Sequence, residues 1–330
     1  MKKGVYIFII FFLLLLFLEI FLRFLGYSPV EFGQKISCKP EICYTSDSLG
    51  ISLKPGNYKV KINDCIDYQV THTNDGRRIT SNKISTAKDK IFIFGCSFAY
   101  GVGVNDQEAF PFLLQNLLLQ YEVYNYAIPG SGTVQSFLYL KKSLESGQRP
   151  KIVVLSYATF HEERNLLTRS FESKLYEGIN FHEGFELSKF YYPRCVIKNN
   201  KITIESIDII KDFKPIPFVK YSAMATFVNQ TWNKLDYLKT DGFLVSEIFF
   251  KKMNKLAKQY HFKLIIADVS YNEKSNEIDS ICVKNNLNYV NISPDYSIGN
   301  YSLAPCDFHP NQSAHQIYAQ NLYEHIKNYK

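Results

Sequence analysis

The sequence lacks a Cys-x-x-Cys pair, and its seven histidines are not spaced like zinc ligands, so no metal site is expected. It also lacks a basic stripe with interleaved aromatic residues, because the formal charge of +7 is modest for 330 residues and the lysines are scattered. Nucleic acid is therefore not an expected partner. No internal repeat or low-complexity tract occurs beyond an apolar run at the N-terminus.

Apolar and aromatic residues, in contrast, are abundant. Hydrophobic residues make up 46% of the chain, with 24 Tyr and 26 Phe, which predicts a folded rather than a disordered chain. The length suits one large domain with additions, or two small domains.

An almost unbroken apolar run extends from Val5 to Leu22 and is long enough to cross a bilayer as one helix. A cleaved signal peptide would be shorter and would end in small residues, whereas this run continues into "EIFLRFLGY". Two lysines precede the run and Arg23 follows it. We therefore expect residues 1–27 to be an uncleaved single-pass membrane anchor, with the N-terminus in the cytoplasm and the remaining chain outside. A buried core helix is the alternative.

Seven cysteines fit an extracytoplasmic location. Six of them could form bridges in an oxidising compartment, which would leave Cys96 as the odd one, but the sequence does not give the connectivity. The six are Cys38, Cys43, Cys65, Cys195, Cys282 and Cys306.

Two patterns divide the rest of the chain. Within residues 28–89, alternation in "DYQVT" and an Asn-Asp-Gly turn predict a small β-rich cap. From residue 90 to 330, apolar runs alternate with amphipathic stretches, which predicts a three-layer α/β domain with a five-stranded parallel sheet. Residues 168–241 interrupt this alternation and are expected to form an insertion, such as a lid on the substrate side. The predicted strands are "KIFIFG", "YEVYNYAI", "KIVVLSY", "FKLIIADV" and "LNYVNI".

Residues suited to acyl transfer follow these strands, where open parallel sheets place their working loops. Ser97 is a candidate nucleophile, and His309 is the base that its hydroxyl needs at neutral pH. Asp307 would orient the imidazole, and the amides of Ser97 and Gly130 would donate to the oxyanion. A thiol nucleophile at Cys96 is the less favoured alternative.

Four stretches, whose order along the chain is that of the family, resemble motifs of the SGNH (GDSL-like) hydrolase superfamily, in particular its membrane-anchored bacterial branch. "GCSFAYGVGV" resembles the first catalytic motif, with Cys96 where the namesake motif has aspartate. "NYAIPGSGTVQ" and "DFHPNQSAHQIYAQ" resemble the second and the last, and "THTNDGRRIT" resembles a stretch that often precedes the first in anchored relatives. The resemblance implies a flavodoxin-like α/β/α fold, a Ser97–His309–Asp307 triad and no cofactor.

The sequence departs from the family pattern in two places. One residue separates Asp307 from His309, where many members have two, and Cys306 stands at the longer spacing. The third motif of the family normally carries an asparagine that donates to the oxyanion, but here the strand leads into "ATFHEERN". His161 is the expected substitute, with Asn165 as the alternative.

The resemblance implies a serine esterase or O-acyltransferase that acts on short acyl esters, with an O-acetylated cell-surface polysaccharide as the expected substrate of an anchored member. Hydrolysis and transfer share one acyl-enzyme, so the sequence does not separate them. A non-catalytic scaffold or carbohydrate-binding protein of the cell envelope is the alternative that the altered third motif favours. A lipase-like enzyme acting on membrane lipids is a second, weaker alternative.

Overall fold

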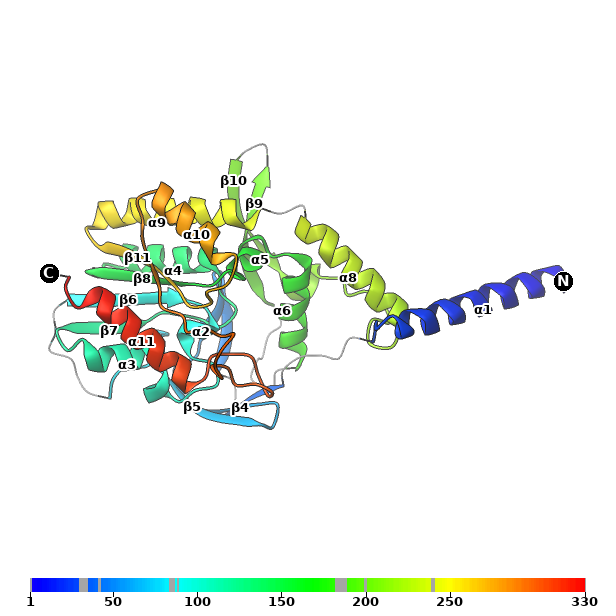
Figure 1. Cartoon of the computed structure of the whole chain (residues 1–330), viewed down its shortest axis with the longest axis horizontal. Helices are drawn as coiled ribbons and strands as arrows, with labels where there is room; N and C mark the ends of the chain where they lie inside the picture. The colour runs from blue at the N-terminus through cyan, green and yellow to red at the C-terminus, as the bar shows by residue number, and fades with distance from the viewer. Residues whose placement is uncertain are drawn as a thin grey trace.

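The computed structural model describes residues 2–29, 35–40, 43–82, 87, 89–181, 189–198, 201–238 and 241–329. A body of mixed helices and strands carries one long helix, α1 (Lys2–Phe24), that projects from it (Figure 1). Residues 3–24 within this helix are long and apolar enough to cross a membrane, and only 6% of the most apolar window is buried by the protein.

The body is built on a five-stranded parallel sheet, which confirms the fold class predicted from the sequence. Its strands lie in the order β12-β11-β8-β6-β7, so β6 occupies the position next to the edge strand β7. The strands are β6 (Asp89–Gly95), β7 (Tyr121–Asn125), β8 (Ile152–Tyr157), β11 (Lys263–Asp268) and β12 (Asn288–Asn291).

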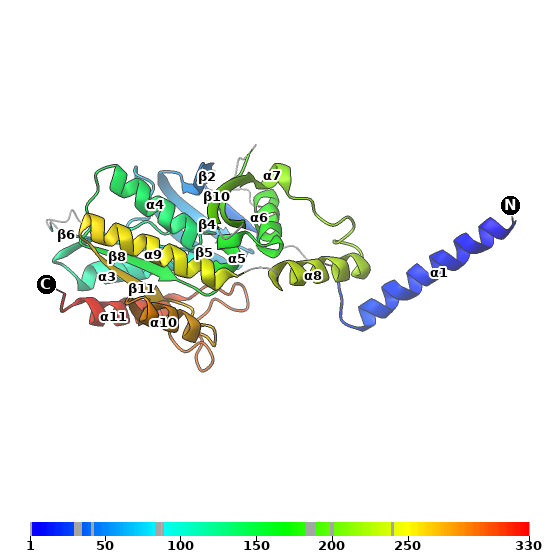
Figure 2. The same ribbon diagram turned by 90° about the horizontal axis from the view of Figure 1, so that it is seen from above.

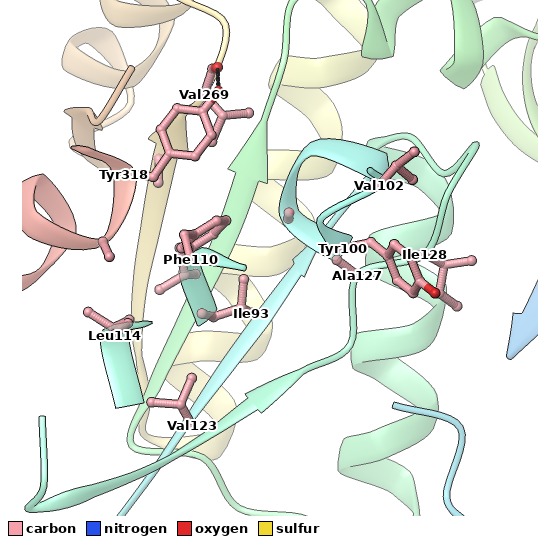
Figure 3. Close-up of a cluster of buried hydrophobic side chains, with 14 of the residues drawn as sticks. Ile93, Tyr100, Val102, Phe110, Leu114, Val123, Ala127, Ile128, Val269 and Tyr318 are labelled. Atoms are coloured by element: carbon pink, nitrogen blue, oxygen red, sulfur yellow. Dashed lines mark hydrogen bonds between the residues drawn. The ribbon is translucent and has the colours of Figure 1, made fainter. Parts of the chain in front are cut away.

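Helices cover both faces of the sheet, and successive side chains of β6 divide between two cores, as the period of two in a strand requires. Ile91 and Ile93 pack with α3 (Phe110–Leu117) and α11 (Gln312–Ile326) on one face, where Figure 3 shows Ile93, Phe110 and Leu114 together. Phe92 and Phe94 pack on the other face. That face is covered by α4 (Thr133–Glu145), α9 (Gly242–Tyr260) and α10 (Ser275–Lys284).

The stretch between β6 and β7 does not form one continuous helix after Asn105. Asn105 and Glu108 cap each other around a separate 3-10 turn, η1 (Asp106–Glu108). Ala109 is then extended, and α3 begins one residue later with Pro111 in its first turn. This local capping satisfies the backbone groups that a continuous helix would have used.

The segment before the sheet forms two small antiparallel sheets. In β4 and β5 every second side chain is buried, as the alternation in the sequence indicated. The strands are β1 (Ile36–Lys39), β4 (Gly56–Ile62) and β5 (Ile66–His72) in one sheet, and β2 (Tyr44–Asp47) and β3 (Gly50–Leu53) in the other.

The segment between β8 and α9 packs around its own apolar cluster, which includes Phe171, Leu175, Phe190 and Tyr192. Its described part consists of four helices and one two-stranded β-hairpin. They are α5 (His161–Leu166), α6 (Arg169–Phe181), β9 (Tyr191–Lys198), β10 (Lys201–Asp208), α7 (Ile209–Asp212) and α8 (Ala223–Leu238).

Four of the seven cysteines form bridges, Cys38–Cys43 and Cys65–Cys306. The expectation that Cys195 and Cys282 also pair is wrong, because each is a free, buried thiol. Cys195 packs with Val134, Val245 and Phe249, and Cys282 lies in the core behind the sheet, so both serve as small apolar side chains. Cys96 is free, as expected.

Candidate functional site

A cavity of about 190 Å³ lies at the carboxyl end of the sheet and is lined by Ser97, Gly130 and His309. These three residues come from different loops, so the topology brings together groups that are far apart in the sequence. The cap adds Ile36 and Ile51 to the lining. The segment after β8 adds Arg164, Lys174, Leu175, Gly178 and Phe190, which is the substrate-side position expected for an insertion.

A larger hollow of about 370 Å³ lies between the cap and α4. Its described lining includes Asp47, Asp75, Tyr126 and Lys142, but none of the predicted site residues. The smaller cavity is therefore the candidate active site, because Ser97 and His309, the predicted nucleophile and base, both line it.

The end of β6 explains why Ser97 stands at the cavity. A Cβ on Gly95 would lie 2.8 Å from the Ser156 carbonyl oxygen of the neighbouring strand, so only glycine fits where the chain leaves the sheet. Ser97 then begins α2 (Ser97–Tyr100), and Gly101 ends this turn in the left-handed conformation with φ +91°. The side chain of Ser97 is held at the sheet edge with the residue only 4% exposed.

Arg78 holds the turn that follows Ser97, and its side chain is fully buried. Its Nε donates to Asp106 Oδ1 at 2.8 Å. Its two terminal nitrogens donate to the carbonyl oxygens of Tyr100, Gly101 and Val104 at 2.5 to 2.9 Å. One guanidinium thus holds the turn after Ser97.

His309 is held by Asp307. Its Nδ1 donates to Asp307 Oδ1 at 2.6 Å, and its backbone amide donates to the same oxygen at 2.6 Å. Burial favours a higher pKa for Asp307, but these hydrogen bonds and the imidazole charge outweigh it and hold the pKa below its ordinary value. With Nδ1 acting as the donor, Nε2 is the basic nitrogen left for the cavity.

The loop that carries Asp307 and His309 is fastened to the cap. Cys306 forms its bridge with Cys65, and the Cys306 carbonyl oxygen accepts from Asn63 Nδ2 at 3.1 Å. On its other side, Asn311 caps α11 by accepting from the Ala314 amide at 3.2 Å. Both ends of the loop are therefore tied.

We expect the double replacement Cys65→Ser/Cys306→Ser to lower both stability and turnover. The bridge spans 241 residues, so its loss should cost about 2–4 kcal/mol of unfolding free energy. Turnover should fall because the loop beside Asp307 loses its tie. Denaturant unfolding and ester turnover measure the two effects. The control is Cys38→Ser/Cys43→Ser, whose bridge spans 5 residues and should matter less. Equal, small effects in both pairs would contradict the role of the longer bridge.

The backbone amides of Ser97 and Gly130 are available to donate hydrogen bonds to an oxyanion. Within the described residues, neither amide donates to a protein oxygen. The Ser97 hydroxyl likewise has no hydrogen-bond partner among these residues, and catalytic hydrogen bonds often form only when substrate binds. Gly130 itself is held in place because its carbonyl oxygen accepts from the Tyr192 hydroxyl at 2.9 Å.

Neither predicted substitute for the missing asparagine is among the described residues that line the cavity. Asn165 is fully buried, and its side-chain oxygen accepts from the amides of Thr133 and Val134 at the start of α4. His161 is fully buried as well, with Nδ1 at 3.4 Å from Thr133 Oγ1 and no hydrogen-bond partner on Nε2. Burial and the charge of Arg164 hold the pKa of His161 well below its ordinary value, so the ring is neutral.

The carboxyl group of Glu162 is buried beside His161, and burial raises its pKa to about 7 although the charge of Lys274 acts in the opposite direction. The unfolded chain releases this proton near the ordinary value of 4.5. Between the unfolded pKa of 4.5 and the folded pKa of about 7, the folded state binds more protons than the unfolded one. Stability therefore falls as pH rises through this range, and the whole loss of stability is present above pH 7.

We therefore expect Glu162→Gln to raise the unfolding midpoint clearly at pH 8 and much less at pH 5, measured by denaturant titration. Glu163→Gln is the matched control, because Glu163 is partly exposed. A Glu162→Gln effect that is the same at both pH values would contradict the raised pKa.

Arg164 is a cavity residue that the sequence patterns did not single out. Its Nη1 donates to the Ser131 carbonyl oxygen at 2.8 Å, and its guanidinium lies 4.3 Å from the Phe160 ring centroid. Its only signal in the sequence is its place after the third strand, between His161 and Asn165. A cation here can attract a carbonyl or a hydroxyl oxygen of a bound ester.

No protein-family model matches this chain, and no curated protein matches it. Several solved structures match this chain. A member of the lipolytic protein G-D-S-L family from Veillonella parvula is 10% identical, with 72% of this chain and 98% of that chain covered and a TM-score of 0.39. A catalytic mutant of the acetylxylan esterase Axe2 from Geobacillus stearothermophilus is 13% identical, with 75% and 97% covered and a TM-score of 0.41. AlinE4, an SGNH-hydrolase family esterase, is 11% identical, with 75% and 96% covered and a TM-score of 0.34.

Proposed function

We propose that this SGNH-like chain is a serine esterase or O-acyltransferase with Ser97 as nucleophile, His309 as general base and Asp307 as the group that orients the imidazole. The observation that carries the proposal is one small cavity that Ser97, Gly130 and His309 all line, with His309 fixed by Asp307 at 2.6 Å. A serine alone is a weak nucleophile, and this arrangement supplies the base it needs.

In the proposed reaction Ser97 Oγ attacks the ester carbonyl carbon while His309 Nε2 takes the hydroxyl proton. The Ser97 and Gly130 amides donate to the oxyanion. Collapse of the intermediate breaks the bond to the alcohol, which leaves with the proton from His309. Water or a second hydroxyl, deprotonated by His309, then attacks the acyl carbonyl carbon, and the bond to Ser97 Oγ breaks as His309 returns the proton to that oxygen.

The cavity favours a short acyl group. Its volume of about 190 Å³ is smaller than the roughly 300–1,000 Å³ typical of sites for larger ligands. Ile36, Ile51 and Leu175 give it apolar walls suited to a methyl group. An acetyl ester fits this volume better than the long chain of a membrane lipid, which is why we prefer an esterase to a lipase-like enzyme.

The proposed substrate is an O-acetylated polysaccharide outside the cytoplasm. Two features support this location: α1 includes a candidate membrane span, and two disulfide bridges suit an oxidising compartment. We propose a single-pass protein with a cytoplasmic N-terminus. A polysaccharide hydroxyl or water would accept the acyl group, so the same site serves either transfer or hydrolysis.

Labelling of the purified full-length protein with a serine-directed phosphonate tests the proposal. We expect one adduct, which peptide mass spectrometry locates on Ser97, and hydrolysis of a chromogenic acetyl ester that the phosphonate blocks. A folded protein with neither labelling nor turnover would instead be the non-catalytic scaffold that the altered third motif favours.

We propose that the His161 ring, which lies buried behind the cavity wall, reaches the oxyanion as a third donor when substrate binds, because its Nε2 lacks a partner among the described residues, whereas the oxygen of Asn165 is engaged at α4. We expect His161→Ala to lower kcat by about a hundredfold, the usual effect of one lost donor. Asn165→Ala should instead reduce stability by about 1–2 kcal/mol, since it uncaps α4, with little change in kcat. Equal kcat losses in the two variants would reject the assignment.

A further inference from the structure

Helix α8 leaves large apolar side chains exposed on its outer side, although one face of the Trp232 ring lies 4.4 Å from the Arg169 guanidinium of the body. Five large apolar residues on it are between 40% and 69% exposed. At about 100° per residue they all fall within one arc of about 140°. The five are Phe227, Val228, Trp232, Leu235 and Leu238.

The side of α8 that faces the protein is polar. Thr226 is buried there, and Asp236 Oδ2 accepts from the Arg169 amide at 2.8 Å. The Asn229 side chain lies 3.5 Å from the Arg169 guanidinium. A helix on the surface of a soluble protein does the opposite, with apolar side chains inward and polar ones outward. The outward arc of α8 is therefore suited to an apolar medium.

The start of α8 is joined to the end of α1. The carboxylate of Glu19 accepts from the amides of Ala223 and Met224 at 2.8 and 3.1 Å, which caps α8 from the other helix. The rings of Tyr27 and Phe227 meet edge to face with centroids 5.2 Å apart. In both views α8 lies between the body and α1, and the two helices meet at a corner (Figures 1 and 2). The outward arc thus begins where the apolar span ends.

We propose that α8 lies in the headgroup region of the bilayer that α1 crosses, with its outward arc against the acyl chains. This inference rests on the proposed membrane anchor. Continuity with α1 identifies the lipid surface as the occupant, because the edge of the bilayer would lie within contact distance of the first turn of α8. Trp, Tyr and Phe side chains favour this depth, and the exposed Lys220 and Lys234 can meet anionic headgroups. The second contact would hold the catalytic domain at a fixed orientation close to the membrane.

Trp232 is the one tryptophan of the chain, so its fluorescence reports on α8 alone. We expect the full-length protein in phosphatidylglycerol–phosphatidylcholine vesicles to show blue-shifted emission. The emission should be quenched by lipids brominated at a shallow acyl position and protected from acrylamide. Val228→Asp/Leu235→Asp should at least halve the quenching by brominated lipid. Gln230→Asp, an exposed site outside the arc, should leave it unchanged.

The outcomes separate this inference from the anchor itself. Protein that carbonate washing removes from the vesicles would overturn the anchor and this inference together. Protein that resists washing, with Trp232 quenched by acrylamide and not by brominated lipid, would overturn the α8 contact alone. Protection from both quenchers would also overturn it and would indicate a protein contact, with a second copy or another partner.

Discussion

Ser97→Ala is expected to lower kcat/KM for an acetyl ester by about 10⁴-fold or more, because no acyl-enzyme can form without the hydroxyl. Fold and stability should be almost unchanged. The side chain loses one oxygen at a position where, among the described residues, the hydroxyl makes no hydrogen bond. Steady-state turnover and circular dichroism of the same preparation measure both effects.

Cys96→Ala is the matched control for Ser97→Ala. The Cys96 thiol is fully buried beside Ser97 and is the alternative nucleophile in the same motif. We expect this variant to keep most of the parent activity. Loss of turnover in Cys96→Ala with full activity in Ser97→Ala would make Cys96 the nucleophile. Full activity in both variants would show that neither residue is the nucleophile.

Arg78→Met is expected to lower the unfolding free energy by about 3–5 kcal/mol, the usual cost of breaking a buried ion pair on one side. The guanidinium is fully buried, and its loss removes the ion pair with Asp106 and one hydrogen bond from each of three carbonyl oxygens, while Asp106 keeps, among the described residues, only the Thr71 amide at 3.3 Å. Turnover should fall too, because these carbonyls belong to the turn after Ser97. Denaturant unfolding measures the first effect and ester turnover the second.

Two further variants keep this prediction testable if Arg78→Met fails to fold. Asp106→Asn retains an acceptor for Arg78 and should cost less. Arg77→Met removes the neighbouring arginine, which is 15% exposed, pairs with a 54% exposed Asp75 and stacks on the Tyr124 ring at 3.8 Å, and it should cost about 1–2 kcal/mol. A loss in Arg78→Met no larger than that in Arg77→Met would contradict the role of the buried guanidinium.

The sheet could be predicted from the sequence because its strands are short and apolar on both faces. In β6, both faces of the strand are buried, so its sequence is one continuous apolar run. Ile91 and Ile93 face one core, and Phe92 and Phe94 face the other. The loops that carry Ser97, Gly130 and His309 then follow from the strand ends. Their meeting in one cavity agrees with the general rule for parallel sheets.

Features that depend on tertiary partners could not be predicted in the same way. Arg78 lies in a polar stretch with no periodic signal, and only its buried acceptors show what it does. The pairing of Cys65 with Cys306 depends on how the cap packs on the last loop, which spacing does not reveal. The reversed polarity of α8 resembles an ordinary amphipathic pattern in sequence, because periodicity shows that two faces differ but not which face is inside.

The Cys65–Cys306 bridge also sets when the proposed enzyme is completed. It joins a hairpin near the start of the chain to the loop of Asp307, across 241 residues. Under the proposed topology this bond forms only after nearly the whole chain has been synthesised, exported and exposed to an oxidant. Under that topology the loop of Asp307 would lack this covalent tie during synthesis and would gain it only outside the cytoplasm.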